Sequence, residues 1–289
     1  MPSFSIIKQS PLAGPLFMLL SACFFTGMNV LLKLAMTEFR VWDIGFYRFF
    51  GGLVLLTAFF GRRGNPFRSS QTRLLVARGC TGSIAFIFFI LSVRLLPVST
   101  ALMLLYAFPA FAAIFSAGLY REKVSPFGWL CLITVLIGVA LLVDPSSGGE
   151  SLGYAAGIFS AIFAGLTMAI IRQLKQTNGS VIIYLYFCLV GSMVTAPFFL
   201  HAPVLPLSFN QILVCGGIIL TSIAGQLLMN HGFGYCRSWE GGLYMTSEVL
   251  FTAIAGIILF RDPVGWHFCG GGTLILGSAV AIQVEQALC

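Results

Sequence analysis

Charged residues are scarce in this chain, and their scarcity excludes most soluble architectures. Asp, Glu, Lys and Arg make up only 9% of the 289 residues, whereas they account for about a quarter of a typical soluble domain. No long polar stretch is present that could fold as a soluble catalytic or nucleic-acid-binding domain. Hydrophobic residues reach 58%, and the mean hydropathy is +0.97. The composition therefore indicates an integral membrane protein.

The motifs of the common enzyme and metal-site classes are also missing. We find no HxxxxD or HExxH motif and no glycine-rich phosphate-binding loop. The eight cysteines form no CxxC pair and lie mostly within apolar segments, which is typical of cysteines that pack as small hydrophobic side chains. The three histidines are scattered. The sequence thus predicts neither an enzyme nor a bound cofactor or metal.

In place of polar regions, the chain has a succession of apolar segments of roughly 20 residues, the length that crosses a ~30 Å hydrocarbon core as a helix. The first segment lacks a strongly basic region before it and a small-residue cleavage site after it, so we expect a mature helix rather than a signal peptide. The predicted fold class is all-α integral membrane, with ten transmembrane helices at about 13–36, 43–61, 74–93, 97–120, 126–143, 152–172, 181–200, 210–233, 240–260 and 265–285.

The net charge of +7 is explained by topology rather than by an acidic partner. Lys and Arg are enriched in the short loops that lie on the cytoplasmic side of the membrane. A cytoplasmic N-terminus places ten positive residues on that side, namely Lys8, Arg62, Arg63, Arg68, Arg73, Arg121, Lys123, Arg172, Lys175 and Arg237. The other side receives Arg40, Arg94 and Arg261, and Lys33 if its side chain extends outward. We therefore expect both termini to be cytoplasmic in the inner (cytoplasmic) membrane, and we expect no binding to nucleic acid.

The two halves of the sequence resemble each other at an offset close to 139 residues. The stretch "LSACFFTGMNVLLKLAM" (20–36) aligns with "FSAIFAGLTMAIIRQLK" (159–175), and "YRFFGGLVLLTAFF" (47–60) aligns with "YFCLVGSMVTAPFF" (186–199). Each half contains five predicted helices, and because five is odd the second half must enter the membrane in the opposite orientation. The sequence therefore predicts two inverted repeats, an arrangement that places a transport site near the bilayer midplane.

Two long stretches carry a resemblance to a known family. Residues 92–142, "SVRLLPVSTALMLLYAFPAFAAIFSAGLYREKVSPFGWLCLITVLIGVALL", resemble the EamA-type domain of the drug/metabolite transporter superfamily, and residues 235–282 resemble its second copy. The resemblance implies an EamA-type repeat at 10–145 and another at 150–287. It identifies the scaffold rather than the substrate. Val249 stands where the family has a proline in the second copy, so we expect the ninth helix to be straighter than in the family.

Positions at which the halves differ in charge are candidates for the site, because an asymmetric substrate needs asymmetric contacts. Arg48 aligns with Phe187, and Glu248 aligns with Phe108. A charge at the centre of a membrane helix costs on the order of 2.5–3.5 kcal/mol, which favours a polar cavity or a partner. The alternative is that these residues form structural ion pairs with each other or with Lys33 or Arg78, both of which lie nearer to helix ends.

Helical spacing extends the candidate site beyond these two charges. Residues three or four apart share a helix face, which places Tyr244 and Phe251 beside Glu248, Gln226 beside Asn230, and Asn29 beside Lys33. Tyr106 and Tyr47 are further candidates. The predicted substrate-binding residues are Glu248, Arg48, Tyr244, Tyr106, Asn29, Gln226, Asn230, Tyr47, Lys33 and Phe251.

These residues predict a secondary transporter of small polar metabolites, which exports or exchanges amino acids or related compounds by alternating access. The acid would bind an ammonium group and the arginine a carboxylate. Two alternatives stay open, a cation such as S-adenosylmethionine or a quaternary amine, and an organic anion. Apart from the substrate and the lipid bilayer, the expected partner is a proton that competes for Glu248, although uncoupled movement is equally open. The oligomeric state is not predicted.

Overall fold

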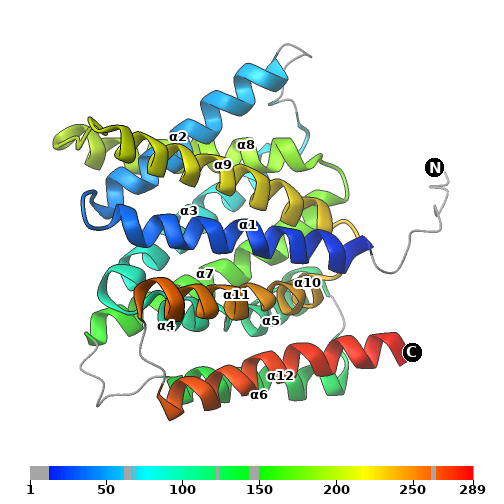
Figure 1. Cartoon of the computed structure of the whole chain (residues 1–289). Coiled ribbons are helices and arrows are strands. Elements are labelled where there is room, and N and C mark those ends of the chain that lie inside the picture. The colour runs from blue at the N-terminus through cyan, green and yellow to red at the C-terminus, as the bar shows by residue number, and fades with distance from the viewer. Residues whose placement is uncertain are drawn as a thin grey trace.

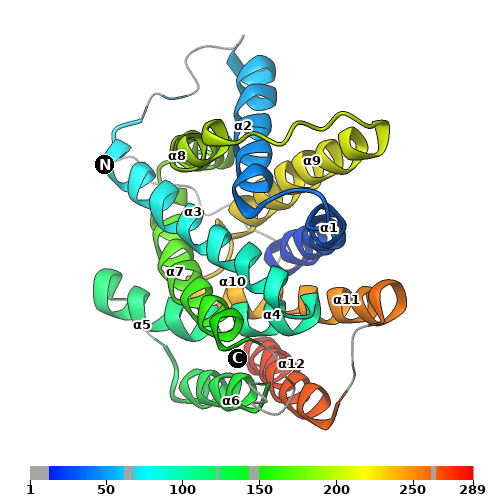
Figure 2. The ribbon, with the colours of Figure 1, turned by 90° about the vertical axis from the view of Figure 1, so that its left-hand side faces the viewer.

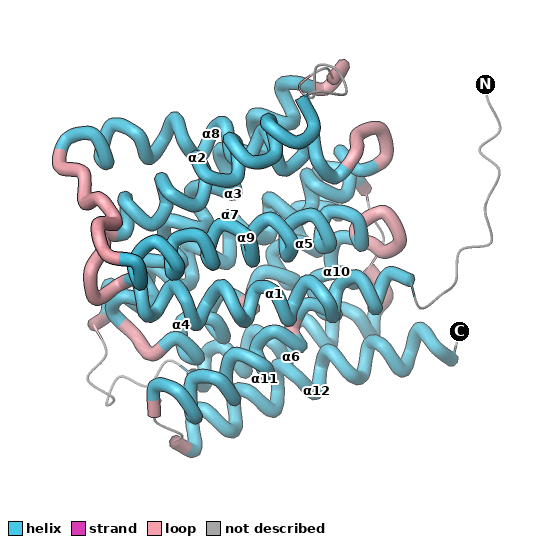
Figure 3. Tube along the Cα trace, turned by 45° about the horizontal axis from the view of Figure 1, so that its top comes forward, coloured by secondary structure: helices cyan, strands magenta, loops and turns pink. Residues whose placement is uncertain are grey.

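The computed structural model describes residues 13–61, 67, 69–121, 124–142, 150–261 and 265–288. All regular elements within these ranges are helices (Figure 3). Five residues that contribute to the predicted charge asymmetry lie outside the described ranges: Lys8, Arg62, Arg63, Arg68 and Lys123.

The first half of the chain forms six helices and the second half forms six helices and a π-helical segment. The first six are α1 (Ala13–Ala35), α2 (Val41–Phe60), α3 (Thr72–Leu95), α4 (Val98–Leu105), α5 (Phe108–Tyr120) and α6 (Pro126–Leu142). The others are α7 (Ser151–Lys175), α8 (Ser180–His201), α9 (Phe209–Gly232), α10 (Ser238–Met245), α11 (Ser247–Ala255), the π-helical segment Gly256–Phe260 and α12 (Trp266–Leu288).

Eight helical stretches among the described residues are long and apolar enough to cross a bilayer. They coincide with the first four predicted segments and with the sixth to the ninth. The apolar stretch in α6 is shorter, at Pro126–Gly138, and α12 lies where the tenth segment was expected. The chain is therefore a multi-pass, all-helical membrane protein, and the count of ten transmembrane helices stays a prediction.

The helices pack mainly as pairs that combine one helix from each half. α1 packs on α9, α3 on α7, α2 on α8 and α6 on α12. The α6–α12 pair lies at one edge of the bundle (Figures 1 and 2). The first turn of α1 and the last turn of α12 lie on the same side of the molecule (Figure 1). Because the halves interlock in this way, the space between them is enclosed by elements of both.

Apolar side chains cover the outside of the bundle, whereas several polar side chains are inside. Phe59, Leu200 and Ile258 are among many large exposed hydrophobic residues, while Arg48 and Glu248 are buried. This distribution is the reverse of a soluble surface and suits a lipid environment, in which buried charges face the bundle interior.

The first-half helix that contains Tyr106 is interrupted immediately after α4. The amide of Ala107 donates to the Leu104 carbonyl at 3.1 Å, and the amide of Ala110 donates to the Ala107 carbonyl at 3.1 Å, so both bonds span three residues instead of four. Pro109 has no amide hydrogen to donate and sits in the first turn of α5, a position that proline tolerates well. The interruption therefore has a direct cause in the sequence.

The corresponding second-half helix is interrupted at Thr246, between α10 and α11, and whether it is straighter than in the family stays a prediction. No proline is present, but two consecutive hydroxyls bond to the preceding turn. Thr246 Oγ1 donates to the Leu243 carbonyl at 2.6 Å, and Ser247 Oγ donates to the Tyr244 carbonyl at 3.0 Å. Ser and Thr that compete for helix carbonyls in this way bend or weaken a helix. Both halves thus contain a broken helix, through different chemistry.

Candidate functional site

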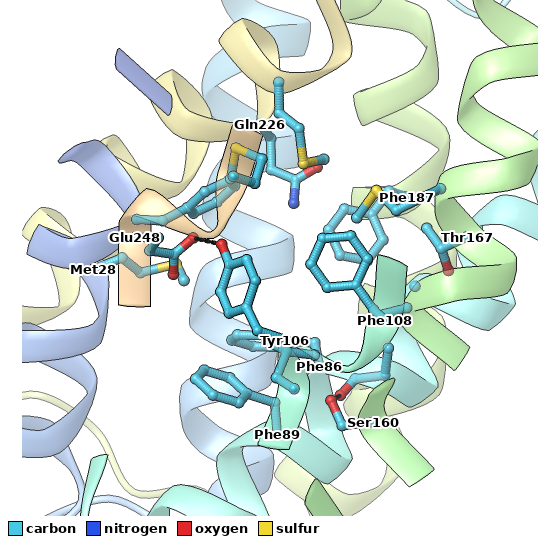
Figure 4. Close-up of a pocket in the computed structure, with 18 of the residues that line it drawn as sticks. Met28, Phe86, Phe89, Tyr106, Phe108, Ser160, Thr167, Phe187, Gln226 and Glu248 are labelled. Atoms are coloured by element: carbon cyan, nitrogen blue, oxygen red, sulfur yellow. Dashed lines mark hydrogen bonds between the residues drawn. The ribbon is translucent and has the colours of Figure 1, made fainter. Parts of the chain in front are cut away.

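A cavity lies at the centre of the bundle, between helices of both halves. Its wall is largely aromatic and aliphatic, with a minority of polar groups that converge on it (Figure 4). The polar side chains of the lining are Asn29, Arg48, Arg78, Tyr106, Ser160, Thr167, Gln226 and Glu248. A largely apolar cavity with a few placed polar groups is typical of small-molecule sites.

Glu248 lies at the junction of the two broken helices. Its Oε2 accepts a hydrogen bond from the Tyr106 hydroxyl at 2.6 Å, and its Oε1 accepts one from Asn29 Nδ2 at 2.8 Å. Figure 4 shows the Tyr106 hydroxyl directed at the carboxyl group. Glu248 is only 5% exposed, so the two donors replace water around the carboxyl group and fix its orientation.

The local helix geometry also favours a negative charge at this position. Glu248 is in the first turn of α11, where the free amides and the helix dipole stabilise an anion. The break at Thr246 creates this helix start in the interior of the protein. Asn29 Oδ1 is buried and accepts no hydrogen bond from the described residues. A carboxylate and an amide oxygen are therefore available together to accept hydrogen bonds from an ammonium group.

Arg48 on α2 also lines the cavity and is enclosed by aromatic rings. Its Nε donates to Ser222 Oγ at 2.6 Å. Its guanidinium carbon lies 3.6 Å from the centre of the Phe86 ring and 5.5 Å from that of Phe187. Arg48 is 2% exposed. Contact with aromatic faces stabilises a desolvated cation by about 2 kcal/mol or more, which offsets part of the burial penalty.

Arg78 on α3 is the second buried cation. It is 1% exposed, and its Nη2 donates to Gln226 Oε1 at 2.9 Å. Its guanidinium carbon lies 3.9 Å from the centre of the Phe187 ring. Its Nε and Nη1 are buried and have no hydrogen-bond partner within the described part of the chain.

Neither arginine is neutralised by the acid. Over the described residues, the recorded ion pairs are Arg40 with Asp43 at 2.8 Å and Arg237 with Glu240 at 3.6 Å, and none includes Glu248. A buried charge without a counter-charge costs several kcal/mol, even after relaxation. The cavity therefore holds two cationic groups and one hydrogen-bonded acid, and neither arginine forms a direct ion pair with that acid.

Half of the residues predicted for the site line this cavity. The five are Asn29, Arg48, Tyr106, Gln226 and Glu248. They come from α1, α2, the end of α4, α9 and α11, so elements distant in the sequence bring them together. The structural ion pair that was the alternative for Arg48 and Glu248 is not present between them.

The other five predicted residues lie away from the cavity lining. The Tyr47 hydroxyl donates to the Val204 carbonyl at 2.6 Å, Lys33 Nζ donates to the carbonyls of Val93 and Leu96 at 3.3 Å, and Asn230 Nδ2 donates to the Ser180 carbonyl at 3.3 Å. These side chains thus bond to backbone carbonyls at helix ends and loops. Tyr244 and Phe251 are partly exposed and are not among the lining residues.

The stripe that grouped Tyr244 and Phe251 with Glu248 fails for a geometric reason. A continuous helical period does not pass through the break at Thr246, so Tyr244 and Glu248 do not share a face as they would on one helix. Within α11, Thr252 lies four residues after Glu248 and contacts the same partner as Glu248. Asn29 Nδ2, which donates to Glu248, also lies 3.4 Å from Thr252 Oγ1.

Several lining residues were not predicted. Arg78 was interpreted as structural because it lies nearer to a helix end, and the hydroxyls of Ser160 and Thr167 were not singled out. Figure 4 places both hydroxyl residues across the cavity from Glu248. The sequence did carry one indication for Arg78, because this residue places a charge within an apolar segment. The aromatic residues Phe86 and Phe187 had no distinguishing signal among 28 phenylalanines.

Comparison with known proteins identifies related sequences over nearly the whole chain. The profile of the EamA-like transporter family matches residues 12–144 and again residues 151–283. The pseudopaline exporter CntI of Pseudomonas aeruginosa is 24% identical, over 94% of this chain and 96% of that protein. The S-adenosylmethionine uptake transporter of Rickettsia prowazekii is 22% identical, over 95% and 94%. Solute carrier family 35 member G1 of Homo sapiens is 24% identical, over 96% and 80%.

A solved structure shares the fold. It superposes with a TM-score of 0.72 at 18% sequence identity and covers 96% of this chain and 99% of its own. At this level of identity the likeness concerns the fold alone.

Proposed function

The chain belongs to the EamA-like transporter family, whose members are transporters and not enzymes, and from this premise we propose that it is a secondary transporter of amino acids or related small polar metabolites. The observation that carries the proposal is the central cavity, in which Glu248 and Arg48 supply opposite charges from the two halves. A zwitterionic substrate offers an ammonium group to the first and a carboxylate to the second. The aromatic walls would enclose the rest of the molecule.

We further propose that the two halves are inverted repeats that alternate between inward-open and outward-open states. The helix pairs support this, because exchanging the halves turns the α1–α9 pair into the α7–α3 pair and leaves α2–α8 and α6–α12 unchanged. The backbone supports it too. Arg121 and Arg261, at φ of 56° and 55°, end the equivalent broken helices in the same left-handed conformation. Such symmetry permits two related conformations around one site.

The broken helices provide the elements that can respond to substrate. Tyr106 lies at the end of α4 and Glu248 at the start of α11, and their hydrogen bond joins the two breaks. A substrate ammonium that draws Glu248 away from Tyr106 or Asn29 would loosen this joint. Since the substrate changes which contacts hold the two halves together, its binding can favour one conformation over the other.

The direction of transport and the cationic alternative are not decided by the relatives. One is named an exporter and another an uptake transporter, so the family is compatible with either direction. The uptake relative is named for S-adenosylmethionine, which supports a cationic substrate as the second candidate. The two unpaired arginines oppose it, because a cationic substrate would add to the uncompensated positive charge. We therefore retain amino acids or related acids as the leading class.

Substitution of Glu248 by Gln tests the proposal. The amide keeps an oxygen for Tyr106 or Asn29 but removes the charge, so affinity for amino acids is expected to fall by about 10- to 100-fold, the range of a lost charge-assisted hydrogen bond of roughly 1.5–3 kcal/mol. The measurement is ligand-induced thermal stabilisation of the full-length protein in detergent, against amino acids, organic cations and organic anions. Glu150→Gln is the control, since Glu150 is an exposed residue at the start of α7.

The same variant tests whether protons are coupled to transport. In proteoliposomes, a Glu248-dependent exchange predicts that the pH gradient accelerates substrate flux in the wild type and not in Glu248→Gln. If the wild type, Glu248→Gln and Glu150→Gln bind amino acids, organic cations and organic anions equally, the proposed site is contradicted. A pH-gradient response that survives in Glu248→Gln would leave the transport proposal standing and remove the proton from it.

A further inference from the structure

We propose that the substrate carries two carboxylate groups and a net negative charge, one carboxylate held by Arg48 and the other by Arg78. This inference rests on the proposed function, because it takes the central cavity to be the substrate site. It assigns a specificity role to Arg78, a residue that the sequence alone favours as structural. Arg78 makes fewer hydrogen bonds than its guanidinium group can donate, and Arg48 lines the same cavity.

Arg78 has more donors than acceptors. A guanidinium carries five N–H groups in a fixed fork that matches a carboxylate. The described protein supplies one acceptor, Gln226 Oε1, and leaves Nε and Nη1 buried without a partner. Buried polar groups in native proteins nearly always have partners, so an orphaned pair of nitrogens beside a cavity points to a missing ligand.

Arg48 lines the same cavity and lies near the same aromatic ring as Arg78. Its Nε donates to Ser222 Oγ at 2.6 Å, and its guanidinium group is a second cation that a ligand in the cavity can meet. Both guanidinium carbons lie near the Phe187 ring, the Arg48 carbon 5.5 Å and the Arg78 carbon 3.9 Å from the ring centre. The two cations therefore lie less than about 10 Å apart, and a single small molecule can reach both.

The packing around Arg78 holds its charge in the cavity wall. Gly82 lies one turn further along α3, and a Cβ atom there would clash with Arg78 Nη1 and approach Phe187 to 3.0 Å. Glycine at this position therefore leaves the space that the guanidinium occupies. On the other side, the amide nitrogen of Gln226 points into the cavity (Figure 4), while its oxygen is bonded to Arg78. Gln226 thus positions the cation and also presents a donor of its own.

The charge balance selects among ligand classes. Two guanidinium groups and one carboxylate give the cavity a net charge of +1, which a cationic ligand would raise. A simple monocarboxylate would balance this charge but would offer acceptors to only one guanidinium group. A molecule with two carboxylates and one ammonium group balances the cavity, since Arg48 and Arg78 take the carboxylates while Glu248 and Asn29 Oδ1 take the ammonium. Aromatic contacts alone would stabilise the cations without satisfying their N–H groups, so they do not replace the ligand.

The experiment compares acids with their own amides. Full-length protein in detergent is titrated with L-aspartate, L-glutamate and L-2-aminoadipate, with L-asparagine and L-glutamine as neutral counterparts, and with L-lysine as a cation. For the chain length that fits, the dicarboxylate is expected to bind at least 10-fold more tightly than its amide. In Arg78→Gln this ratio is expected to fall to about one, whereas in the control Arg94→Gln, an exposed residue of the same helix, it is unchanged.

A structural role for Arg78 makes a different prediction. If Arg78 served only to pack the helices, Arg78→Gln would lower the melting temperature of the ligand-free protein. The inference expects a ligand-free melting temperature equal to or above that of the wild type, because a buried uncompensated charge is removed. The titration of the wild-type protein tests the inference even if a variant fails to fold.

The outcomes separate the inference from the proposed function. Wild-type protein that binds the amides or lysine as tightly as the dicarboxylates overturns the inference, and the transporter proposal survives. A preference for dicarboxylates that persists in Arg78→Gln overturns the assignment to Arg78. If no compound of any class binds, the proposed function fails, and the inference fails with it.

Discussion

The Tyr106 hydroxyl reaches Glu248 from the other half of the chain, and a single oxygen atom therefore links the two broken helices. The bond is short, at 2.6 Å, and both side chains are nearly inaccessible to solvent. Hydrogen bonds to a charged group contribute about 1.5–3 kcal/mol, roughly twice as much as those between neutral groups. The second donor, Asn29, comes from α1. Glu248 of the second half is consequently held by two elements of the first half, α1 and the end of α4.

Substitution of Tyr106 by Phe removes this link and little else. The ring is retained, so packing against Phe108 at 5.2 Å between ring centres is preserved. The ligand-free protein is expected to lose about 1.5–3 kcal/mol of stability, because a buried acceptor loses its donor. The measurement is the melting temperature in detergent. Tyr235→Phe is the control, since the Tyr235 hydroxyl is exposed and lies 3.4 Å from His231 Nε2. A melting temperature lowered equally in both variants would contradict a special role for Tyr106.

Sequence reasoning located part of the site at this scale. Arg48 and Glu248 were identifiable because each introduces a charge where the other half has Phe, and the structure places both on the cavity. Tyr47 and Lys33 carried a similar polar signal, yet they bond to backbone carbonyls. A polar residue in an apolar helix indicates that a partner is needed. Whether the partner is a ligand or a carbonyl depends on which helix lies opposite, and tertiary packing alone determines that.

At the scale of elements, the first-half broken helix makes a close backbone contact with α7 through α5. Gly165 of α7 lies against α5, and a Cβ atom at this position would approach Ala112 N to 2.7 Å and Phe108 O to 2.9 Å. Both are backbone atoms, so no side-chain rotation can relieve the contact. The glycine therefore sets how near α7 comes to the broken helix that carries Tyr106.

Gly165→Ala is expected to push α5 away from α7 and to destabilise the protein by about 1–3 kcal/mol, the usual cost of overpacking. Gly216→Ala on α9 is the matched control, because a Cβ atom there meets nothing within 4 Å. The control is expected to be neutral or to gain up to about 1 kcal/mol from the better helix propensity of alanine. Melting temperatures and ligand affinity of both variants provide the check. A Gly165→Ala protein as stable as the control would contradict the contact.

The two helix breaks were not equally visible in the sequence. A proline at position 109 is a strong local signal, and it coincides with the first break. The second break arises from Thr246 and Ser247, whose hydroxyls bond to carbonyls of the preceding turn. Ser and Thr occur in many membrane helices without a break, so their presence alone did not predict one. The absence of proline at Val249 therefore led to an expectation of a straighter helix, and it does not exclude the break at Thr246.

At the scale of the whole molecule, the fold class followed from composition and hydrophobic segment length, because apolar segments of about 20 residues can satisfy their backbone hydrogen bonds within lipid as helices. The positions of eight membrane-crossing stretches agree with the predicted segments. The pairing of helices between halves could not be derived in the same way. Apolar segments of similar composition give no information about their neighbours, and contacts such as those of Gly165 depend on three-dimensional packing.

The orientation of the chain in the membrane remains a prediction, and α7 offers a direct test of it. Glu150 and Gln176 flank this 25-residue helix and are both exposed. Positive charge gathers at the Gln176 end, where Arg172 and Lys175 occupy the last turn, and the positive-inside rule assigns this end to the cytoplasm. The Glu150 end is then expected to face outward.

Single substitutions Glu150→Cys and Gln176→Cys report on the two ends separately. A membrane-impermeant maleimide applied to intact cells is expected to label Glu150→Cys and to label Gln176→Cys only after permeabilisation, with the wild type measuring the background from the native cysteines. The reverse pattern would invert the predicted orientation. Labelling of both variants in intact cells would show that α7 does not separate the two compartments, because the two ends of a single spanning helix cannot share one side.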